Sequence, residues 1–321
     1  MRLADLSSAL ILGVAGAVAV AALAANGGRG SPELDLLSEF APIFVGAGLL
    51  ALVAAIWVRR WARPPLLVLG FLSLAGGAWL MTPEFLRDQG PVAPADAPGQ
   101  IKIIQFNTLQ TNEHVGAVAD WLAAENPDIV TIQEARHDLR DVLKTRTGWQ
   151  VAGAAGNLMI FSRAPRIRMD RPTIGPPGHL HWVNATYPSA SGPYEVVTVH
   201  LGWPIGPGQR FQWAQLAALL HHWPTDRMIL AGDFNATPWS SAMRTGEAAL
   251  PLFRRDRAIP TFPATWRTDE PVRAPFAILP IDHVYAGRGW ATVKVERGPN
   301  LGSDHYPLVI TLAPVAAAKS P

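Results

Sequence analysis

Met228-Ile229-Leu230-Ala231-Gly232-Asp233-Phe234-Asn235 is the stretch that decides how this chain folds and where its chemistry lies. Its first four residues are apolar and predict a buried β-strand, which is followed at once by a carboxylate and an amide. A second stretch, Gly302-Ser303-Asp304-His305, stands just before the apolar run 307–310. Buried polar groups need partners. We therefore expect both stretches to face a cleft in which a metal ion or a phosphate is the partner of their polar side chains.

Polar residues also stand at the ends of four other predicted strands. They are Asn107 after 101–106, Glu134 after 128–133, His200 at the end of 195–200, and Asp282 in 281–285. Taken singly, each has an ordinary explanation, because Asn and Asp are common turn residues and a lone His is usually structural. Six such strand ends in one chain predict that these side chains converge on one rim of a sheet.

The region from residue 101 onward alternates between strand and helix signals. Val115, Val118, Ala119 and Leu122 have the spacing of an amphipathic helix, which Asn126-Pro127 ends. Further helices are predicted at 138–145 and 209–222. The remaining strands are predicted at 158–161, 181–187, 291–296 and 308–312. About eight strands with only a few helices indicate an α+β sandwich with helices on its outer faces.

The N-terminal region has a different composition, with three long apolar runs. Residues 6–25, 40–58 and 64–83 contain no charged residue, and each is long enough to cross roughly 30 Å of hydrocarbon as a helix. A signal peptide followed by two buried helices is the alternative, but no good cleavage site separates the runs. We expect a membrane domain at 1–88, a Pro-rich linker at 89–99, a folded domain at 100–313 and a disordered tail at 314–321.

The basic residues predict how these helices are oriented. The connection Arg59–Arg63 holds three arginines and no acid, whereas the connection at 26–39 holds one arginine and three acids. The positive-inside rule places Arg59–Arg63 in the cytoplasm. Three crossings then put the C-terminal domain outside the cytoplasm, in a multi-pass protein of the cell (inner) membrane. The absence of cysteine agrees with a domain that needs no disulfides.

The charge of the C-terminal domain argues against a dedicated nuclease. From residue 99 onward the chain has 21 Lys and Arg against 18 Asp and Glu, together with all nine histidines. A domain that grips nucleic acid through phosphate contacts usually has a larger basic excess. Nucleic acid is therefore the less favoured partner.

The set of strand-end motifs, in this order, resembles the endonuclease/exonuclease/phosphatase superfamily, the DNase I-like proteins. The resemblance covers residues 101–312 and rests on six short motifs. These are Phe106-Asn107, Gln133-Glu134, Thr198–Leu201, Gly232–Asn235, Ile281–His283 and Ser303–His305. It implies a four-layer α/β sandwich and metal-dependent hydrolysis of phosphoesters.

The resemblance implies a metal site and a route for water activation. Glu134 offers the hard oxygen that Mg²⁺ prefers, Asn107 supports the ion through its amide oxygen, and Asp304 completes the site or binds a second ion. Asp233 orients and deprotonates the attacking water, and Asn235 donates a hydrogen bond to the transition-state oxyanion. Mn²⁺ is the alternative cofactor. Thr108 follows Asn107, where several nucleases of the family carry an acidic residue, so no second carboxylate is predicted there.

Two histidines complete the predicted catalytic set. His305 contacts the phosphate, while Asp282 holds its imidazole in one tautomer and favours the cation. His200 stands where the family has a His or Tyr that assists the phosphate or the leaving group. Trp203, Trp239 and Trp266 follow catalytic strands, and the sequence leaves open whether they line a cleft, face a bilayer or pack in the core.

The predicted function combines this site with the membrane helices. The layout is similar to VanJ-type membrane proteins, and it predicts a hydrolase of a lipid phosphate, a lipid pyrophosphate or a phospholipid headgroup. Its predicted partners are the lipid bilayer and the lipid substrate, and no protein partner is inferred. The alternatives are an extracytoplasmic endonuclease or exonuclease and a non-catalytic membrane-binding protein.

Overall fold

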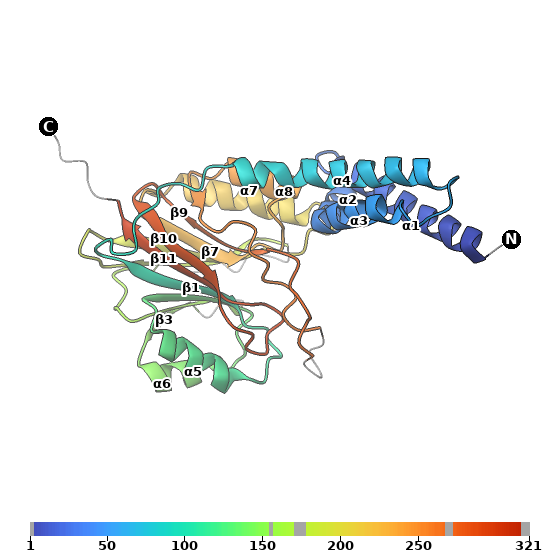
Figure 1. The fold of residues 1–321 in the computed structure, drawn as a ribbon. Helices are drawn as coiled ribbons and strands as arrows, with labels where there is room; N and C mark the ends of the chain where they lie inside the picture. Colours follow the sequence, from blue (N-terminus) through green and yellow to red (C-terminus); the bar gives the residue numbers. More distant parts are fainter. Residues whose placement is uncertain (1–2, 154–156, 170–177, 267–271, 316–321) are drawn as a thin grey trace. The chain divides into compact units, whose positions relative to one another are not determined.

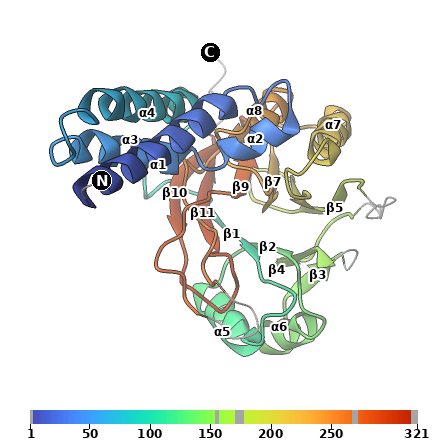
Figure 2. The same cartoon turned by 90° about the vertical axis from the view of Figure 1, so that its right-hand side faces the viewer.

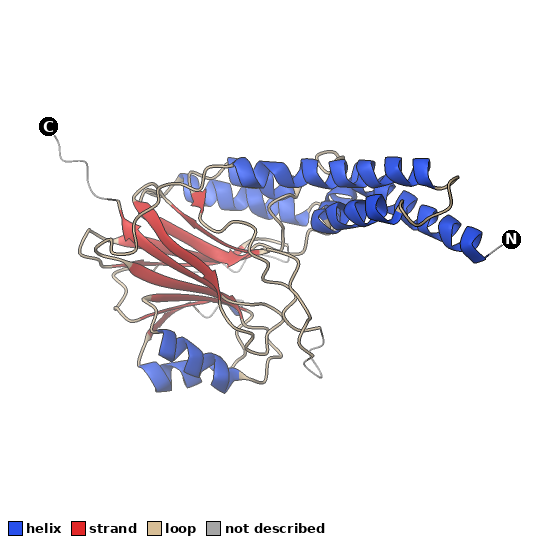
Figure 3. Cartoon of the chain, in the orientation of Figure 1, coloured by secondary structure: helices blue, strands red, loops and turns tan. Residues whose placement is uncertain are grey.

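The computed structural model describes residues 3–153, 157–169, 178–266 and 272–315 (Figure 1). The chain divides into two compact units, and neither is one continuous stretch of sequence. The helical unit comprises Met1–Arg87, Pro204–Arg210 and Ala236–Glu247. The sheet unit comprises Asp88–Trp203, Phe211–Asn235 and Ala248–Pro321. Helices and strands are distinguished by colour in Figure 3.

The described part of the helical unit contains two helices that are long and apolar enough to cross a membrane. These are α1 (Leu3–Ala25) and α4 (Arg63–Leu86). The predicted second crossing is wrong as a single helix, because its α3 (Ala41–Ala54) has 14 residues, or about 21 Å of rise. The chain bends by 59° between α3 and the preceding α2 (Pro32–Ser38). Three crossings arise only if this bent pair acts as one span, a break that the composition of 40–58 did not indicate.

Small residues let these helices approach closely. A Cβ on Gly76 would lie 3.0 Å from the carbonyl oxygen of Ala22, and one on Gly48 would meet the backbone of Gly70 at 2.8 Å. Asn26 Nδ2 also donates to the Gly76 carbonyl at 3.3 Å, which joins the end of α1 to α4. Glycine at such crossings is typical of helices that associate in a bilayer.

Among its described residues, the sheet unit contains two sheets, a six-stranded one and a five-stranded one (Figure 2). The six-stranded sheet has the order β10-β11-β1-β2-β4-β3, formed by Trp290–Arg297, Leu308–Pro314, Ile101–Asn107, Ile129–Gln133, Met159–Ser162 and Gln150–Ala152. The five-stranded sheet has the order β5-β6-β7-β9-β8, formed by His181–Tyr187, Tyr194–His200, Met228–Asp233, Asp282–Ala286 and Phe253–Arg254.

The main core lies between the two sheets. One buried cluster combines Ile103 and Ile129 of the first sheet with Val196, Ile229 and Val284 of the second. On the outer face of the six-stranded sheet, a second cluster joins β1, β2 and β4 to α5 (Val115–Glu125) and α6 (Leu139–Thr147). The α7 helix (Gly208–His221) places Trp213 in a stacked contact with Phe234, directly after β7.

The predicted α+β fold with two sheets is confirmed, and most predicted strands and helices form within one or two residues of their expected bounds. The short strands β3 and β8 and the helix α8 (Ser241–Ala248) were not predicted. Strand β11 extends to Pro314, one residue into the predicted disordered tail, and residues 316–321 of that tail lie outside the described residues.

Candidate active site

The register of the strands brings the predicted polar residues to one edge of the two sheets. Strands β1 and β2 are parallel, so Asn107 lies opposite Gln133, the residue before Glu134. In the other sheet β6 and β7 are also parallel, and His200 lies opposite Asp233. Parallel strands end at the same edge. Asp282, at the start of the antiparallel β9, is paired with Asp233 and reaches this edge as well.

Asp233 is the centre of the site and is almost completely buried. Its Oδ2 accepts a hydrogen bond from Asn107 Nδ2 at 2.9 Å. The same oxygen lies 3.6 Å from His200 Nε2 and 3.7 Å from His305 Nε2. Burial raises the pKa of Asp233, while the charges of His305 and His200 act in the opposite direction. A carboxyl group with a raised pKa at the meeting point of two imidazoles suits a general base.

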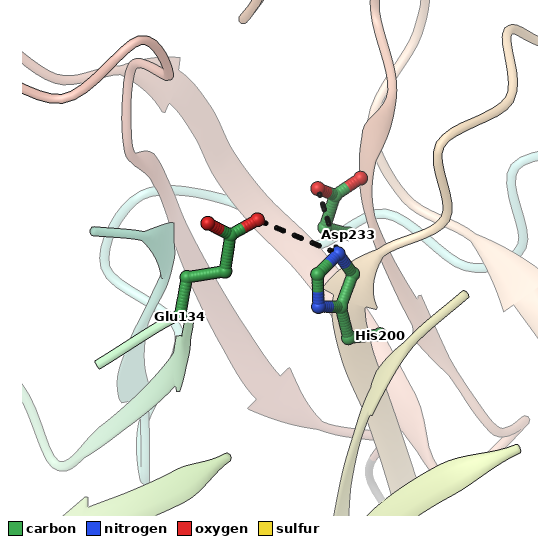
Figure 4. A group of neighbouring side chains, drawn as sticks. All are labelled: Glu134, His200 and Asp233. Atoms are coloured by element: carbon green, nitrogen blue, oxygen red, sulfur yellow. Dashed lines mark ion pairs between the residues drawn. The ribbon is translucent and has the colours of Figure 1, made fainter. Parts of the chain in front are cut away.

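Glu134 and His200 form one wall of the site with Asp233 (Figure 4). Glu134 Oε1 lies 3.7 Å from His200 Nε2 and accepts a hydrogen bond from Asn107 Nδ2 at 3.0 Å. Glu134 has φ of 50°, a left-handed conformation that is uncommon outside glycine. This backbone turn follows the last residue of β2 directly, and it is a strained geometry of the kind found at functional sites.

The donors at this edge fit a divalent cation. One ligand atom each from Glu134, His200 and Asp233 lie within 4.8 Å of one another. Asp233, Asp282 and His305 form a second such group, but the raised pKa of His305 keeps its imidazole protonated, so this group suits a cation less well. Carboxylate oxygens are the ligands that Mg²⁺ and Mn²⁺ prefer. The predicted metal residues Asn107 and Asp304 belong to neither group. The Asn107 amide nitrogen faces the carboxylates, while its oxygen accepts from Leu109 N at 3.1 Å, so their metal roles remain predictions.

His305 is held by a buried carboxylate. Its Nδ1 lies 2.8 Å from Asp282 Oδ2, and Gln105 Nε2 donates to Asp282 Oδ1 at 2.6 Å. Burial alone would lower the pKa of His305, but the charges of Asp282 and Asp233 outweigh it and raise the pKa to about 10. His305 is therefore a cation at neutral pH, with Nε2 facing Asp233.

Asn235 is positioned by its own backbone. Its φ is 47°, and its N–H donates to Asp233 Oδ1 at 2.8 Å. Its side-chain nitrogen donates to the Leu201 carbonyl at 2.8 Å and lies 3.2 Å from His200 Nε2. The amide therefore links the loops that follow β6 and β7, and its role at an oxyanion remains a prediction.

Asp304 lies at the rim of the same cluster. Burial raises its pKa, and the charge of Glu134 acts in the same direction, against that of His305. Its Oδ1 is 4.0 Å from His305 Nε2. The neighbouring Ser303 Oγ donates to the Asn107 carbonyl at 2.7 Å and accepts from His305 N at 3.0 Å, which joins this loop to the end of β1.

The structure shows supporting roles for three residues to which the sequence motifs assign none. Gln105 orients Asp282, Ser303 ties two strand ends together, and Gln133 Nε2 donates to Thr198 Oγ1 at 2.8 Å between the two sheets. In the sequence, these roles are indicated only by the polar side chains of Gln105 and Gln133, which stand inside otherwise apolar strands. Polar side chains in such positions need buried partners.

The three tryptophans have different environments. Trp239 is buried, and Trp266 is largely exposed. Trp203 is also exposed, and its ring packs edge-to-face on Phe262 with centroids 5.9 Å apart. Phe262 in turn lies 5.1 Å from the His305 ring. An aromatic path thus leads from the active-site histidine to the surface of the sheet unit.

Comparisons with known proteins agree with this geometry. The model of the Endonuclease/Exonuclease/phosphatase family matches residues 104–305, which include all eight predicted site residues. No curated protein matches the chain.

Similar solved structures have low sequence identity and therefore support the fold alone. A mannosyl-6-phosphatase from Bacteroides thetaiotaomicron is 14% identical with a TM-score of 0.53, covering 66% of this chain and 99% of its own. D. rerio TDP2 complexed with a single-strand DNA product is 16% identical with a TM-score of 0.53, covering 66% and 98%. The human Nocturnin catalytic domain with bound sulfate is 20% identical with a TM-score of 0.52, covering 73% and 99%.

Proposed function

The chain belongs to the endonuclease/exonuclease/phosphatase family, and we propose that it is a divalent-metal-dependent phosphoester hydrolase acting on a lipid phosphate or pyrophosphate at a membrane surface. The observation that carries the chemistry is the buried Asp233 carboxylate, which has Asn107, His200 and His305 around one oxygen. This arrangement places three nitrogen groups, one amide and two imidazoles, around the oxygen of a single base.

In the proposed hydrolysis, each of these residues has its own role. Asp233 accepts the proton of the attacking water, and Asn107 orients its carboxylate. His305, already protonated, donates from Nε2 to a phosphoryl oxygen and compensates the charge that develops there. His200 stabilises the departing oxygen. A cation held by Glu134 and its neighbours would neutralise the phosphoryl oxygens and lower the pKa of the water.

The helical unit supports a lipid substrate. Two of its helices are long and apolar enough to cross a membrane, and the chain enters the sheet unit directly after α4. Tethering a hydrolase next to a bilayer raises the effective concentration of lipid phosphates at its site. The small basic excess of the C-terminal region favours a lipid over nucleic acid.

One experiment tests the substrate class and the metal requirement together. Full-length protein in detergent is given a lipid pyrophosphate, a choline phospholipid or plasmid DNA, with Mg²⁺ or with EDTA. We expect phosphate release from the lipid pyrophosphate that EDTA abolishes. Glu134→Gln and Asp233→Asn should each lower the rate about 100-fold or more. Glu296→Gln, a neutralisation at an exposed residue of β10, is the matched control and should leave the rate unchanged.

The remaining outcomes distinguish the alternatives. Nicking of the plasmid without lipid hydrolysis would identify a nuclease. Lipid hydrolysis that survives EDTA and Glu134→Gln would refute the metal-dependent mechanism. No turnover of any substrate by folded protein would leave a binding protein that has kept the fold.

A further inference from the structure

The helical unit contains a pocket of about 610 Å³, and none of the active-site residues described above lines it. It lies where the last turns of α1 and α4 meet the start of α8, and Arg29 and Arg244 line it. Among its lining residues in the described part of the chain, these two are the charged ones. Trp79, Leu80 and Leu86 of α4 form an apolar wall beside them. The pocket is therefore cationic at one side and apolar along the other.

The first turn of α8, which carries Arg244, is held by a buried carboxylate of α2. The two oxygens of Asp35 accept hydrogen bonds from Ser241 N at 2.6 Å and Ala242 N at 2.8 Å, and Ser240 Oγ accepts from Met243 N at 3.1 Å. Three of the free N–H groups at the start of α8 are thus satisfied. Arg244 lies on the first turn of this capped helix and is partly buried.

The backbone at Arg29 is held by separate contacts on the turn that follows α1. Arg210 donates hydrogen bonds to the carbonyl of Gly28 and, at 3.3 Å, to that of Arg29. Position 28 has no room for a residue larger than glycine, because a Cβ on Gly28 would lie 2.6 Å from Asp35 Oδ1. The backbone beside the pocket is therefore held at several points, while the Arg29 side chain stays exposed.

The two guanidinium groups have no anion of their own. Within the described part of the chain, neither side chain forms a hydrogen bond or an ion pair, and Asp35 is already occupied by α8 and by Arg210 at 3.7 Å. Burial lowers the pKa of Arg244, and the nearby charge of Arg29 lowers it further, against the attraction of Asp35. An anion between the two arginines would relieve this repulsion.

The position of the pocket suggests the source of that anion. It lies at the ends of two helices that are long enough to span a bilayer. The ends of such helices lie at the depth of the lipid headgroups. Trp79 is 75% exposed and Leu86 is 79% exposed on the α4 wall. Exposed tryptophan near the end of such a helix is typical of a membrane interface. An inorganic anion would leave this apolar wall uncovered, whereas a lipid would cover it with an acyl chain.

We infer that this pocket binds the phosphate group of an anionic membrane lipid, with Arg29 and Arg244 on the phosphate oxygens and an acyl chain along Trp79, Leu80 and Leu86. Arginine suits this role because its planar donors match phosphate oxygens in pairs. The inference deepens the proposed function, because it assigns a place where a lipid phosphate is held, but binding itself requires no turnover.

The test measures binding apart from catalysis. Full-length protein in a neutral detergent with EDTA is titrated with phosphatidic acid, phosphatidylcholine or inorganic phosphate, and bound ligand is counted by native mass spectrometry. We expect phosphatidic acid to bind about tenfold or more tightly than the other two. Arg29→Gln and Arg244→Gln should each weaken its binding about tenfold, the loss expected for a charge-assisted hydrogen bond. The melting temperature of each variant checks that it is folded.

The control is Arg60→Gln, an exposed arginine that precedes the opposite end of α4. It should not change binding. The inference is overturned if the double variant Arg29→Gln/Arg244→Gln binds phosphatidic acid like the wild type. It is also overturned if Arg60→Gln weakens binding equally, or if inorganic phosphate binds as tightly as the lipid. Arginine-dependent binding without any hydrolysis would refute the proposed function alone. Hydrolysis with unchanged binding in the double variant would refute this inference alone.

Discussion

The Nδ1 atom of His305 lies 2.8 Å from Asp282 Oδ2, in a pair that is almost entirely removed from solvent. The other Asp282 oxygen is held by Gln105 at 2.6 Å, so the carboxylate cannot turn away. Asp282 with Asp233 raises the pKa of His305 to about 10 in spite of burial. The stability that this pair contributes is fully present below about pH 6.5, the ordinary histidine pKa, and is lost as the pH rises through about 10.

Replacing Asp282 by Asn should therefore lower both the activity and the pH at which it declines. The variant keeps the size of the side chain but removes the charge that keeps His305 protonated. We expect kcat to fall about 100-fold and the alkaline limb of the pH–rate profile to move toward neutrality. Asp120→Asn, at an exposed helix position, should leave the profile unchanged. An alkaline limb that stays in place in Asp282→Asn would contradict this account of His305.

Divalent cations should stabilise the folded protein through Glu134. At about 100 times its dissociation constant, a ligand that binds only the native state adds about 2.7 kcal/mol. The melting temperature should therefore rise with Mg²⁺ or Mn²⁺ concentration in the wild type and stay flat in Glu134→Gln. Equal rises in both proteins would place the cation elsewhere. Differential scanning fluorimetry provides this measurement without any substrate.

The sheet unit should lose stability in acid through Asp256. This buried carboxylate lies 2.7 Å from His283 Nδ1 and accepts from Val284 N at 2.9 Å. Burial would raise its pKa, but His283 and Arg254 outweigh that effect and hold the pKa well below its usual range. Its contribution to stability is present above about pH 3.9 and is lost as the pH falls below that value.

Asp256→Asn should accordingly lower the free energy of unfolding by about 3 kcal/mol at pH 7, because it breaks a buried charged pair. The variant should also lose less stability than the wild type between pH 5 and pH 3. Thermal unfolding followed by circular dichroism over this range gives both values. Parallel losses in the two proteins would show that another group controls the acid limb.

The sequence was sufficient to predict the two sheets and the rim of polar residues. Strand-end residues such as Asp233 and Asn107 are informative because their strands are apolar and leave polar side chains only at the ends. Their partners were harder to predict. Gln105 and Ser303 act through contacts with residues more than 170 positions away, and no local pattern reports such a separation.

The helical unit was predicted less well, because composition shows apolar length but not where a helix bends. Residues 40–58 carry no charge, yet the helix within them ends at Ala54 and the chain bends before Ala41. The sequence also gave no sign that 236–247 would join the helices, because the partners Asp35 and Glu39 lie about 200 residues earlier. Both acids looked like ordinary loop charges.

Asp35→Ala should destabilise the loop that follows the catalytic strand β7. The change removes both carboxylate acceptors from the start of α8, for which we expect about 2 kcal/mol. The readouts are the melting temperature of the full-length protein and the rate of proteolysis within 236–247. Glu33→Ala, on the same short helix but exposed, is the control. Unchanged proteolysis in Asp35→Ala would show that the loop is held by other contacts.

The contacts inside the helical unit also bear on orientation. Asp5 pairs with Arg59 at one end of the helices, whereas Asp35 meets 241–242 at the other. If the arginines of 59–63 stay in the cytoplasm, a C-terminal alkaline phosphatase fusion should be active and a C-terminal green fluorescent protein fusion should stay dark. A fluorescent fusion with an inactive phosphatase would reverse the assignment.

The hydrogen bonds of Asp35 and Glu39 have a consequence for the order of biosynthesis. Asp35 is synthesised 206 residues before Ser241, and Glu39 precedes its partner Thr237 by 198 residues. The first helices therefore leave the ribosome with two carboxylates that still await their donors. These helices reach their final state only after most of the chain has been translated. At typical elongation rates of about 5–20 residues per second, that interval lasts on the order of ten seconds or more.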